Sequence, residues 1–426
     1  MKVAIAGYGV EGESSYRYYI ERGDAVTIVD ENSAPKRPLP DGANTILGEG
    51  SFSRLNGFDL VVRTAGLNPQ VIRTDGTIWS ATNEFFTRCP ALIIGVTGTK
   101  GKGTTCSLIA SILRASGRNV HLVGNIGTPA LDTLSSIQPD DIVVYEMSSF
   151  QLWDIKMSPK IAVVLMIEQD HLDVHADMNE YLLAKSNIVK YQSSDDTVIY
   201  HPTNPNTAKV VEGALSHKVR YAIPDDQQVY VRDDLFFIQN RPICSVDAMQ
   251  IPGAFNCENA CAAISAALLA GASVDAVEAG LRSFAGLPHR LKFVREVNNV
   301  RYYDDSIATT PGSAIAALSA FTQPKVIILG GSDKGADYRT LIEACRDAEA
   351  AVVAIGQTGG RIYDLCKELG VSVHRETGDM NAVVAAASSI AKENGVVILS
   401  PASASFDQYK SYIDRGEQFT TAVGRL

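Results

Sequence analysis

The strongest structural signal in this chain is the stretch Ile94-Gly-Val-Thr-Gly-Thr-Lys-Gly-Lys-Gly-Thr-Thr105. An apolar run, 91–96, leads into it, and the apolar positions of 108–113 behind it fall on one helical face. Strand, glycine-rich turn and helix in this order are typical of a phosphate-binding loop. Glycines let successive backbone N–H groups point at a polyphosphate, and the helix N-terminus adds partial positive charge. The stretch therefore predicts a nucleotide site at the edge of a parallel sheet.

Side chains of this loop also have expected roles. Lys102 is expected to reach the β- and γ-phosphates, and Thr104 or Thr105 to bind Mg²⁺. The match to the standard loop is imperfect, because its first glycine would fall at Val96 and Gly103 stands where Ser or Thr is usual. A plain flexible turn is the alternative, which the flanking strand and helix oppose. The residues expected at the phosphates are Gly98, Thr99, Lys100, Gly101, Lys102, Gly103, Thr104 and Thr105.

The length of 426 residues predicts about three domains. Apolar runs rich in β-branched residues alternate with helix-length segments, a rhythm typical of parallel α/β sheets. We place the domains at 1–87, 88–286 and 287–426, with a hinge around 286–291. Buried strands are expected at 3–6, 25–29, 60–62, 91–96, 142–145, 161–167, 326–329, 351–355 and 396–399, and an alanine-rich helix at 260–269.

Composition excludes several classes of protein. The net charge of −10 argues against a nucleic-acid binder, whose affinity rests on clustered Lys and Arg. No apolar run approaches the roughly 20 residues that span a bilayer, and the N-terminus lacks the pattern of a signal peptide. The seven cysteines are scattered without a C-x-x-C pair, which favours a reduced, cytoplasmic protein. We expect small-molecule partners and a monomer, although no sequence feature fixes the oligomeric state.

Candidate metal ligands follow two of the expected strands. Glu146 ends the run 142–145, and His171 follows the run 161–167. Carboxylates at the carboxyl ends of parallel strands beside a phosphate loop lie where Mg²⁺ is held. A zinc site at His171 is the alternative, and it lacks a thiolate or a convincing second histidine. Lys185 lies on an expected helix, where spacing alone favours a surface lysine.

Together these motifs resemble the Mur ligase family, whose central domain is shared with folylpolyglutamate synthetases. The resemblance covers essentially the whole chain and rests on many motifs in matching order. It implies an α/β fold of three domains: Rossmann-like at the N-terminus, P-loop ATPase-like in the centre and Rossmann-like at the C-terminus. The matching motifs are Gly95–Thr105, Gly124-Asn-Ile-Gly-Thr-Pro-Ala130, Glu146-Met-Ser-Ser-Phe-Gln151, Asp170-His171, Ala184-Lys185, Asn256–Asn259, Leu287-Pro-His-Arg290, Asp304-Asp-Ser306, Gly330-Gly-Ser-Asp-Lys334 and Ser400-Pro-Ala-Ser-Ala-Ser-Phe-Asp-Gln408.

The resemblance implies an ATP-dependent ligase with two Mg²⁺ ions. Lys102 would hold the ATP phosphates, while Glu146 and His171 would bind Mg²⁺ with help from Thr104. Lys185 falls where the family carries a carbamylated lysine, which reverses the interpretation drawn from spacing and makes it a further metal contact. Carbamylation needs the neutral amine, so the pKa of this lysine must be lowered by burial or by a nearby metal.

The resemblance also implies the substrates: ATP, glutamate and UDP-N-acetylmuramoyl-L-alanine, joined through an acyl phosphate. Asn125 would lie near the substrate pyrophosphate. Nucleotide contacts would come from Asn256, Asn259, Arg290 and Asp305, and the pocket for glutamate from Lys334, Ser405, Phe406 and Tyr412.

The first turn, Gly7-Tyr-Gly-Val-Glu-Gly12, fits a dinucleotide fingerprint, with Asp30 after the next strand. Read alone, it suggests an NAD-dependent oxidoreductase. A UDP pyrophosphate satisfies the same physics, and the NAD interpretation leaves the second phosphate loop unexplained. We therefore expect UDP contacts at Val10, Glu11, Asp30 and Gly66.

Two positions depart from the family pattern. Ile307 stands where many D-glutamate-adding members carry a lysine, which leaves the choice between D- and L-glutamate open, and Phe255 stands where histidine is frequent. A folylpolyglutamate synthetase is one alternative, opposed by the nucleotide-type N-terminal domain. A non-catalytic nucleotide-binding homologue is another, opposed by the joint presence of Lys102, Glu146, His171 and Lys185.

Overall fold

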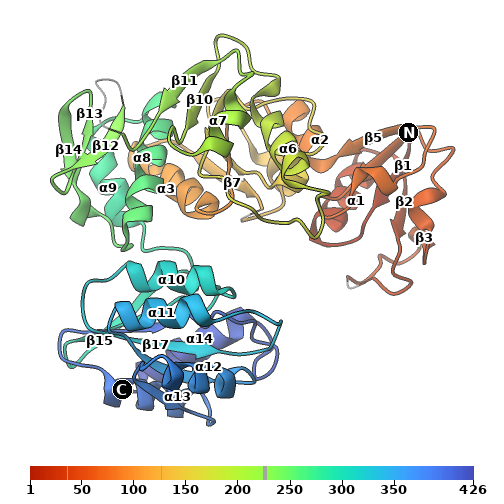
Figure 1. Ribbon diagram of the computed structural model, residues 1–426. Helices are drawn as coiled ribbons and strands as arrows, with labels where there is room; N and C mark the ends of the chain where they lie inside the picture. Colours follow the sequence, from red (N-terminus) through yellow and green to blue (C-terminus); the bar gives the residue numbers. More distant parts are fainter. Residues whose placement is uncertain (36, 126, 224–227) are drawn as a thin grey trace. The chain divides into compact units, whose positions relative to one another are not determined.

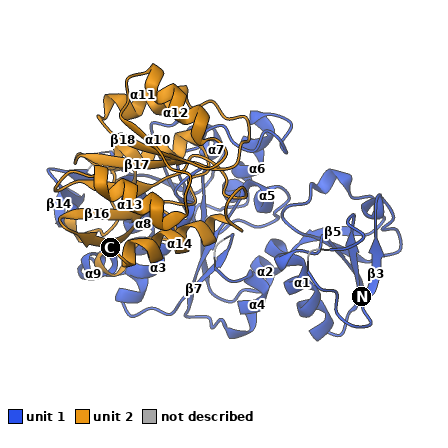
Figure 2. Cartoon of the chain, turned by 90° about the horizontal axis from the view of Figure 1, so that it is seen from below, with its two compact units in different colours: residues 1–246, 258–281 blue, residues 247–257, 282–426 orange. Residues whose placement is uncertain are grey.

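The computed structural model describes residues 1–35, 37–125, 127–223 and 228–426 (Figure 1). The chain forms two compact units (Figure 2). The first unit comprises residues 1–246 and 258–281, and the second comprises residues 247–257 and 282–426. Ile126, part of the expected motif 124–130, lies outside the described residues.

The first unit begins with a five-stranded parallel sheet in the order β3-β2-β1-β4-β5. The order changes direction at β1, so the turns after β1 and β4 meet where open parallel sheets bind ligands. Its helix α1 (Val10–Glu21) starts directly after the first glycine turn. The strands are β1 (Lys2–Ala6), β2 (Ala25–Asp30), β3 (Asn44–Leu47), β4 (Leu60–Arg63) and β5 (Thr77–Ser80).

A second parallel sheet of the first unit has the order β11-β10-β9-β6-β8-β7. The central strand β6 is completely buried from Ile94 to Thr97 and lies between β8 and β9. Its phosphate loop therefore opens between the ends of β8 and β9. The strands are β6 (Leu92–Thr97), β7 (Val120–Gly124), β8 (Ile142–Glu146), β9 (Ile161–Val164), β10 (Thr197–Tyr200) and β11 (His217–Arg220).

Helices connect the strands of this second sheet, as parallel pairing requires (Figure 1). The helix that leaves the phosphate loop, α3, carries the apolar face expected from the sequence, and Gly117 follows its last turn with a φ of 78°. The helices are α2 (Ala81–Arg88), α3 (Lys102–Ala115), α4 (Ala130–Thr133), α5 (Ser149–Leu152), α6 (Met178–Lys190) and α7 (Pro205–Val211).

The segment after the second sheet was predicted only in part, through the alanine-rich helix expected at 260–269. It forms a three-stranded antiparallel sheet, followed by two helices. The hydroxyl of Ser111 on α3 donates to the carbonyl of Gly280 at 2.8 Å, so the second of these helices packs on α3. The elements are β12 (Val229–Arg232), β13 (Leu235–Ile238), β14 (Arg241–Ser245), α8 (Ala254–Leu269) and α9 (Asp275–Ser283).

The second unit contains a six-stranded sheet in the order β15-β16-β20-β17-β18-β19, with only β15 antiparallel to its neighbour. Two buried apolar clusters surround β17, β18 and β20. Its strands are β15 (Lys292–Val297), β16 (Val300–Asp304), β17 (Lys325–Gly330), β18 (Ala351–Ile355), β19 (Val373–Arg375) and β20 (Val396–Leu399). Its helices are α10 (Pro311–Ser319), α11 (Arg339–Asp347), α12 (Gly359–Glu368), α13 (Met380–Ile390) and α14 (Tyr412–Gly424).

The expected α/β class with three parallel-sheet regions is confirmed. The expectation for 161–167 is wrong at its end, because β9 stops at Val164. Beyond it the chain bends towards the phosphate loop: the N–H of Leu165 donates to the Thr97 carbonyl, and the N–H of Thr99 donates to the Met166 carbonyl. The domain boundaries at 87 and 286 stay predictions. Within the described ranges, no helix is long and apolar enough to cross a membrane.

Candidate active site

Two glycines shape the loop between β6 and α3. Gly98 and Gly101 have φ angles of 153° and 83°, which residues with a Cβ rarely adopt. A Cβ at Gly101 would lie 2.3 Å from Oδ1 of Asn259, and one at Gly98 would lie 2.7 Å from Cβ of Leu165. Both positions therefore require glycine, and the loop packs directly against α8 and the end of β9.

Two lysines point at the backbone of this loop. Nζ of Lys102, at the first position of α3, donates to the carbonyls of Gly98 and Thr99 at 3.1 and 3.0 Å. Nζ of Lys185, on α6, donates to the same Gly98 carbonyl at 2.9 Å and to Oγ1 of Thr97 at 3.3 Å. Residues 83 positions apart in the sequence are thus brought to one oxygen atom.

Lys185 is 1% exposed, so the surface lysine inferred from spacing is wrong. Burial is the main cause that lowers its pKa well below the usual value, and the nearby charge of Lys102 acts in the same direction. Nζ also lies 4.7 Å from the ring centroid of Tyr181, one helical turn before it. This shift favours the neutral amine more than on an exposed lysine.

Glu146 ends β8 beside the loop and is 6% exposed. One of its carboxylate oxygens, Oε1, accepts from Nδ2 of Asn125 at 3.1 Å, and its carbonyl accepts from the N–H of the same asparagine. On α3, Thr104 and Thr105 are buried, and Oγ1 of Thr105 has no hydrogen-bond partner within the described residues. A buried hydroxyl without a partner and a nearby carboxylate are oxygen ligands of the kind that Mg²⁺ takes.

His171 lies on a turn after β9 and is about half exposed. Its φ of 55° is unusual for a side chain with a Cβ. Its ring centroid lies 4.9 Å from that of Phe150 on α5, the short helix that follows the end of β8. The described part of the chain holds no group of three His, Cys, Asp or Glu side chains arranged for a metal ion. Any metal here would take ligands from backbone, hydroxyl or substrate oxygens as well.

Sequence reasoning gave no role to His175 and Tyr181. Nε2 of His175 lies 3.0 Å from Oγ of Ser149, and its ring stacks on Phe150 at a centroid distance of 5.4 Å. Burial lowers the pKa of His175. Tyr181 donates or accepts a hydrogen bond with Oγ1 of Thr99 at 3.1 Å. The sequence did contain a signal for each. His175 lies four residues after His171, and Tyr181 lies four residues before Lys185, one helical turn away.

The first turn meets the loop after β4, as the strand order requires. Oε2 of Glu11 accepts from the N–H of Ala65 at 2.6 Å, and burial raises the pKa of this carboxyl. Asp30 accepts from the N–H groups of Tyr8 and Asn32, both at 2.8 Å. Asp30 therefore braces the first turn. Val10 and Gly66 are exposed on the same turns.

The other expected nucleotide contacts divide between the units. Asn259 lies against Gly101 in the first unit. In the second, Asn256 is buried and donates to the Pro252 carbonyl, and Arg290 is exposed. Asp305 accepts from Oγ of Ser400 at 2.7 Å and from the N–H of Leu291 at 3.1 Å, and burial raises its pKa to about 7.

Of the residues expected at glutamate, Lys334, Ser405 and Phe406 lie on loops at one end of the second unit's sheet, and Tyr412 is the first residue of α14. Ser405 is buried, whereas Lys334 and Phe406 are exposed, and Tyr412 and Ile307 are half-buried. A cavity of about 290 Å³ is lined by Asp407 and Gln408, which follow Phe406 on the loop after β20, and by Gly356, Gln357 and Thr377 after β18 and β19.

Arg415, on α14, fixes these loops from inside. It is completely buried and donates to the carbonyls of Ser306, Ser403 and Ala404 and to Oγ of Ser306. Burial lowers the pKa of its guanidinium to about 10. Arg415 thereby joins the loop after β16 to the loop after β20.

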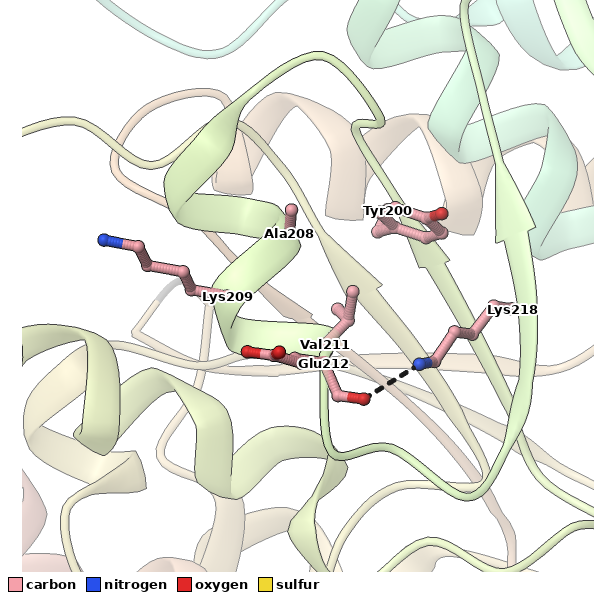
Figure 3. A pocket seen from close by; sticks show the side chains of 6 residues that line it. All are labelled: Tyr200, Ala208, Lys209, Val211, Glu212 and Lys218. Carbon is pink, nitrogen blue, oxygen red and sulfur yellow. Dashed lines mark hydrogen bonds between the residues drawn. The ribbon is translucent and has the colours of Figure 1, made fainter.

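A larger cavity of about 370 Å³ lies between α7, β10 and β11 (Figure 3). Nζ of Lys218 donates to the Glu212 carbonyl across it at 3.0 Å. None of the expected site residues lines this cavity, so the volume of a cavity alone does not identify the active site. The residues that line the cavity are Tyr200, Ala208, Lys209, Val211, Glu212 and Lys218.

Comparison with known proteins gives a consistent result. The family model for the Mur ligase middle domain matches residues 96–267, and that for the Mur ligase glutamate ligase domain matches residues 289–403. The UDP-N-acetylmuramoylalanine–D-glutamate ligase of Symbiobacterium thermophilum is 35% identical, covering all of this chain and 98% of the relative. The enzyme of the same name from Clostridium kluyveri is 34% identical, covering all of this chain and 97% of the relative.

Solved structures share the fold at lower identity. The UDP-N-acetylmuramate-alanine ligase MurC of Thermotoga maritima aligns with a TM-score of 0.61 and 18% identity, over all of this chain and 99% of that one. The MurF ligase of Thermotoga maritima, solved in complex with ADP, aligns with a TM-score of 0.60 and 17% identity, over 99% and 95%.

Proposed function

This chain belongs to the Mur ligase family, and from that membership we propose that it is an ATP-dependent ligase that adds D-glutamate to UDP-N-acetylmuramoyl-L-alanine. The full-length identity of 35% to a relative of that name is the observation that carries the proposal. The product would serve peptidoglycan precursor synthesis.

The reaction needs a phosphate site next to a carboxylate acceptor. The L-alanine carboxylate attacks the γ-phosphorus of ATP, and ADP leaves. The glutamate amine then attacks the resulting acyl phosphate, forming the amide bond and releasing phosphate. Little of this chemistry requires a protein nucleophile, so positioning and electrostatic stabilisation supply most of the rate.

The first unit offers the groups for that work. Lys102 would leave the loop carbonyls and donate to the ATP phosphates. Glu146, His171 and a hydroxyl of Thr104 or Thr105 would hold Mg²⁺, and the buried, unpartnered oxygen of Thr105 supports the hydroxyl ligand. When bound, Mg²⁺ supplies positive charge that reduces the repulsion between ATP and the anionic acceptor.

Lys185 would act as its carbamate. Its neutral amine attacks CO₂, an N–C bond forms as one C=O π bond opens, and the nitrogen loses one proton to solvent, so a neutral amine becomes an anionic carbamate. The burial that lowers the pKa of Lys185 supports this step. The carbamate would then contact the second Mg²⁺ or orient the transferred phosphate.

The ends of the substrates would be held elsewhere. Asn125 and the turns of the first sheet, with Val10, Glu11, Asp30 and Gly66, would bind the uridine diphosphate. Asn256, Asn259, Arg290 and Asp305 would contact the nucleotide of ATP. Glutamate would meet the second unit's residues Lys334, Ser405, Phe406 and Tyr412.

One assay tests the proposal. The protein is incubated with ATP, Mg²⁺ and UDP-N-acetylmuramoyl-L-alanine, D- and L-glutamate are offered separately, and phosphate release is measured. We expect release with D-glutamate. Release with L-glutamate alone would reassign the acceptor, for which Ile307 in place of lysine gives a reason. If neither D- nor L-glutamate leads to phosphate release, the substrate assignment is refuted, and a folate-type acceptor would be tried next.

A further inference from the structure

Arg63, the last residue of β4, is a completely buried arginine at the join between the two sheets of the first unit. Nε and Nη2 donate to the two carboxylate oxygens of Asp154 at 2.7 and 2.5 Å. Nη2 also donates to the Phe150 carbonyl at 2.8 Å. Nη1 donates to three carbonyls of the loop after β4, those of Thr64, Ala65 and Leu67, at 3.1–3.3 Å.

The guanidinium thus has acceptors on two sides. Its five N–H donors are fixed in one plane, so the side facing Asp154 and the side facing the loop are held at a set separation. A lysine would keep the charge but present its donors from one atom, and it would lose one of the two sides. The arrangement therefore depends on the shape of arginine as well as on its charge.

The groups that Arg63 joins both adjoin the proposed site. The loop 64–67 contains Gly66, and Glu11 also holds this loop through the Ala65 N–H. On the other side, Phe150 follows Glu146 by four residues, and its ring lies 4.9 Å from the ring of His171. No described contact links Arg63 itself to the phosphate loop.

We propose that Arg63 is a positioning residue that sets the loop 64–67, which would bind the substrate diphosphate, against the Phe150–Asp154 segment beside the metal-binding strand end. The proposal rests on the proposed function. Arg63 holds the nucleotide-sugar end at a fixed distance from the place where the alanine carboxylate meets ATP. Its loss weakens the binding of the nucleotide-sugar substrate more than it weakens the binding of ATP.

The chain offers a matched control. Arg17 on α1 pairs with Asp132 on α4, with Nη2 to Oδ2 at 2.8 Å, and so also joins an element of the first sheet to one of the second. The Arg17 side chain is half exposed, and no hydrogen bond among the described residues joins this pair to the loop 64–67 or to the Phe150–Asp154 segment. Arg17→Lys therefore tests the same arginine-to-lysine change in an ion pair that joins the same two parts of the first unit, away from the loop 64–67 and the Phe150–Asp154 segment.

The experiment compares wild type, Arg63→Lys, Asp154→Asn and Arg17→Lys. Calorimetry measures binding of UDP and of UDP-N-acetylmuramoyl-L-alanine without ATP, and steady-state assays give kcat and both KM values. For Arg63→Lys we expect a roughly tenfold weaker affinity and higher KM for the UDP substrate, by analogy with the loss of other supporting partners, and an ATP KM within about twofold of wild type. Asp154→Asn, which leaves Arg63 in place, should change the same constants in the same direction. Arg17→Lys should match wild type.

Two outcomes would overturn the inference. In the first, Arg63→Lys and Asp154→Asn bind the UDP substrate with the same affinity as Arg17→Lys. In the second, Arg63→Lys raises the KM for ATP as much as it raises the KM for the UDP substrate. Failure of the proposed function looks different, because wild type itself would then bind neither UDP nor UDP-N-acetylmuramoyl-L-alanine.

Discussion

Lys102 and Lys185 donate to one acceptor, the carbonyl oxygen of Gly98, at 3.1 and 2.9 Å. Two ammonium groups this close repel each other, and Lys185 is the buried one. The charge of Lys102 therefore lowers the pKa of Lys185 in the same direction as its burial does. A carbamate on Lys185, as proposed above, would turn this repulsion into an attraction.

Replacing Lys102 by alanine should reduce kcat by about 10³-fold or more, because a charge-assisted contact to the transferring phosphate is lost. Lys190→Ala is the control, since Lys190 is exposed on α6 and has no expected role at the site. Steady-state phosphate release measures both variants. Comparable rates for the two would remove Lys102 from the site.

Lys185→Ala should be nearly inactive and should regain part of its activity when a short carboxylate such as formate or acetate is added, because the carboxylate would replace the carbamate anion. Lys190→Ala, an exposed lysine on the same helix, should behave as wild type. The measurement is phosphate release against carboxylate concentration. A fully active Lys185→Ala protein would exclude any carbamate role.

Glu146→Gln should lower kcat and raise the Mg²⁺ concentration needed for half-maximal rate, because a neutral amide is a weaker ligand for a hard cation. The exposed Glu168 gives the control variant, Glu168→Gln. Rates are titrated against Mg²⁺ at saturating ATP. If the two titration curves coincide, Glu146 is not a metal ligand.

Asp305 predicts a pH dependence of stability. Burial raises its pKa to about 7 from 3.8, so between these values the folded protein keeps a proton that the unfolded chain has lost. Its contribution to stability is therefore full below about pH 4 and is lost as the pH rises towards 7, a change of at most about 4 kcal/mol. In thermal unfolding without nucleotide, the unfolding temperature of Asp305→Asn should rise relative to that of wild type as the pH increases from 4 to 8. The exposed Asp364→Asn should show no such gain, and parallel profiles for Asp305→Asn and wild type would contradict the shifted pKa.

The sequence was sufficient to predict an element where a single local pattern determines it. The buried strands at 351–355 and 396–399 were predicted to the residue, because continuous apolar runs between helix-length segments leave few alternatives. The antiparallel β12–β14 sheet was missed, since short strands with polar positions such as Arg232 and Arg241 carry a weak signal. The early start of α8 at Ala254 was missed as well.

The candidate site shows the same limit. The phosphate loop and Glu146 follow from patterns within a few residues. Arg63 had no such pattern, because its partners Phe150 and Asp154 lie about 90 residues away, on and after helix α5, and its role depends on burial. The burial of Lys185 could not be predicted from its spacing, since the spacing of a helix does not reveal which neighbours cover it, and only the family resemblance gave this lysine a role.

The buried guanidinium of Arg415 has a consequence for how the second unit is made. The carbonyls that it holds lie after β16 and β20, whereas the arginine itself lies on α14, which follows every strand of that sheet. On the ribosome, the strands emerge before the helix that completes their loops. A nascent chain halted before residue 415 can pair its strands but must leave those carbonyls to water. The loops after β16 and β20 are therefore completed last, when α14 docks, and a chain released before residue 415 would keep a sheet whose end loops lack their internal support.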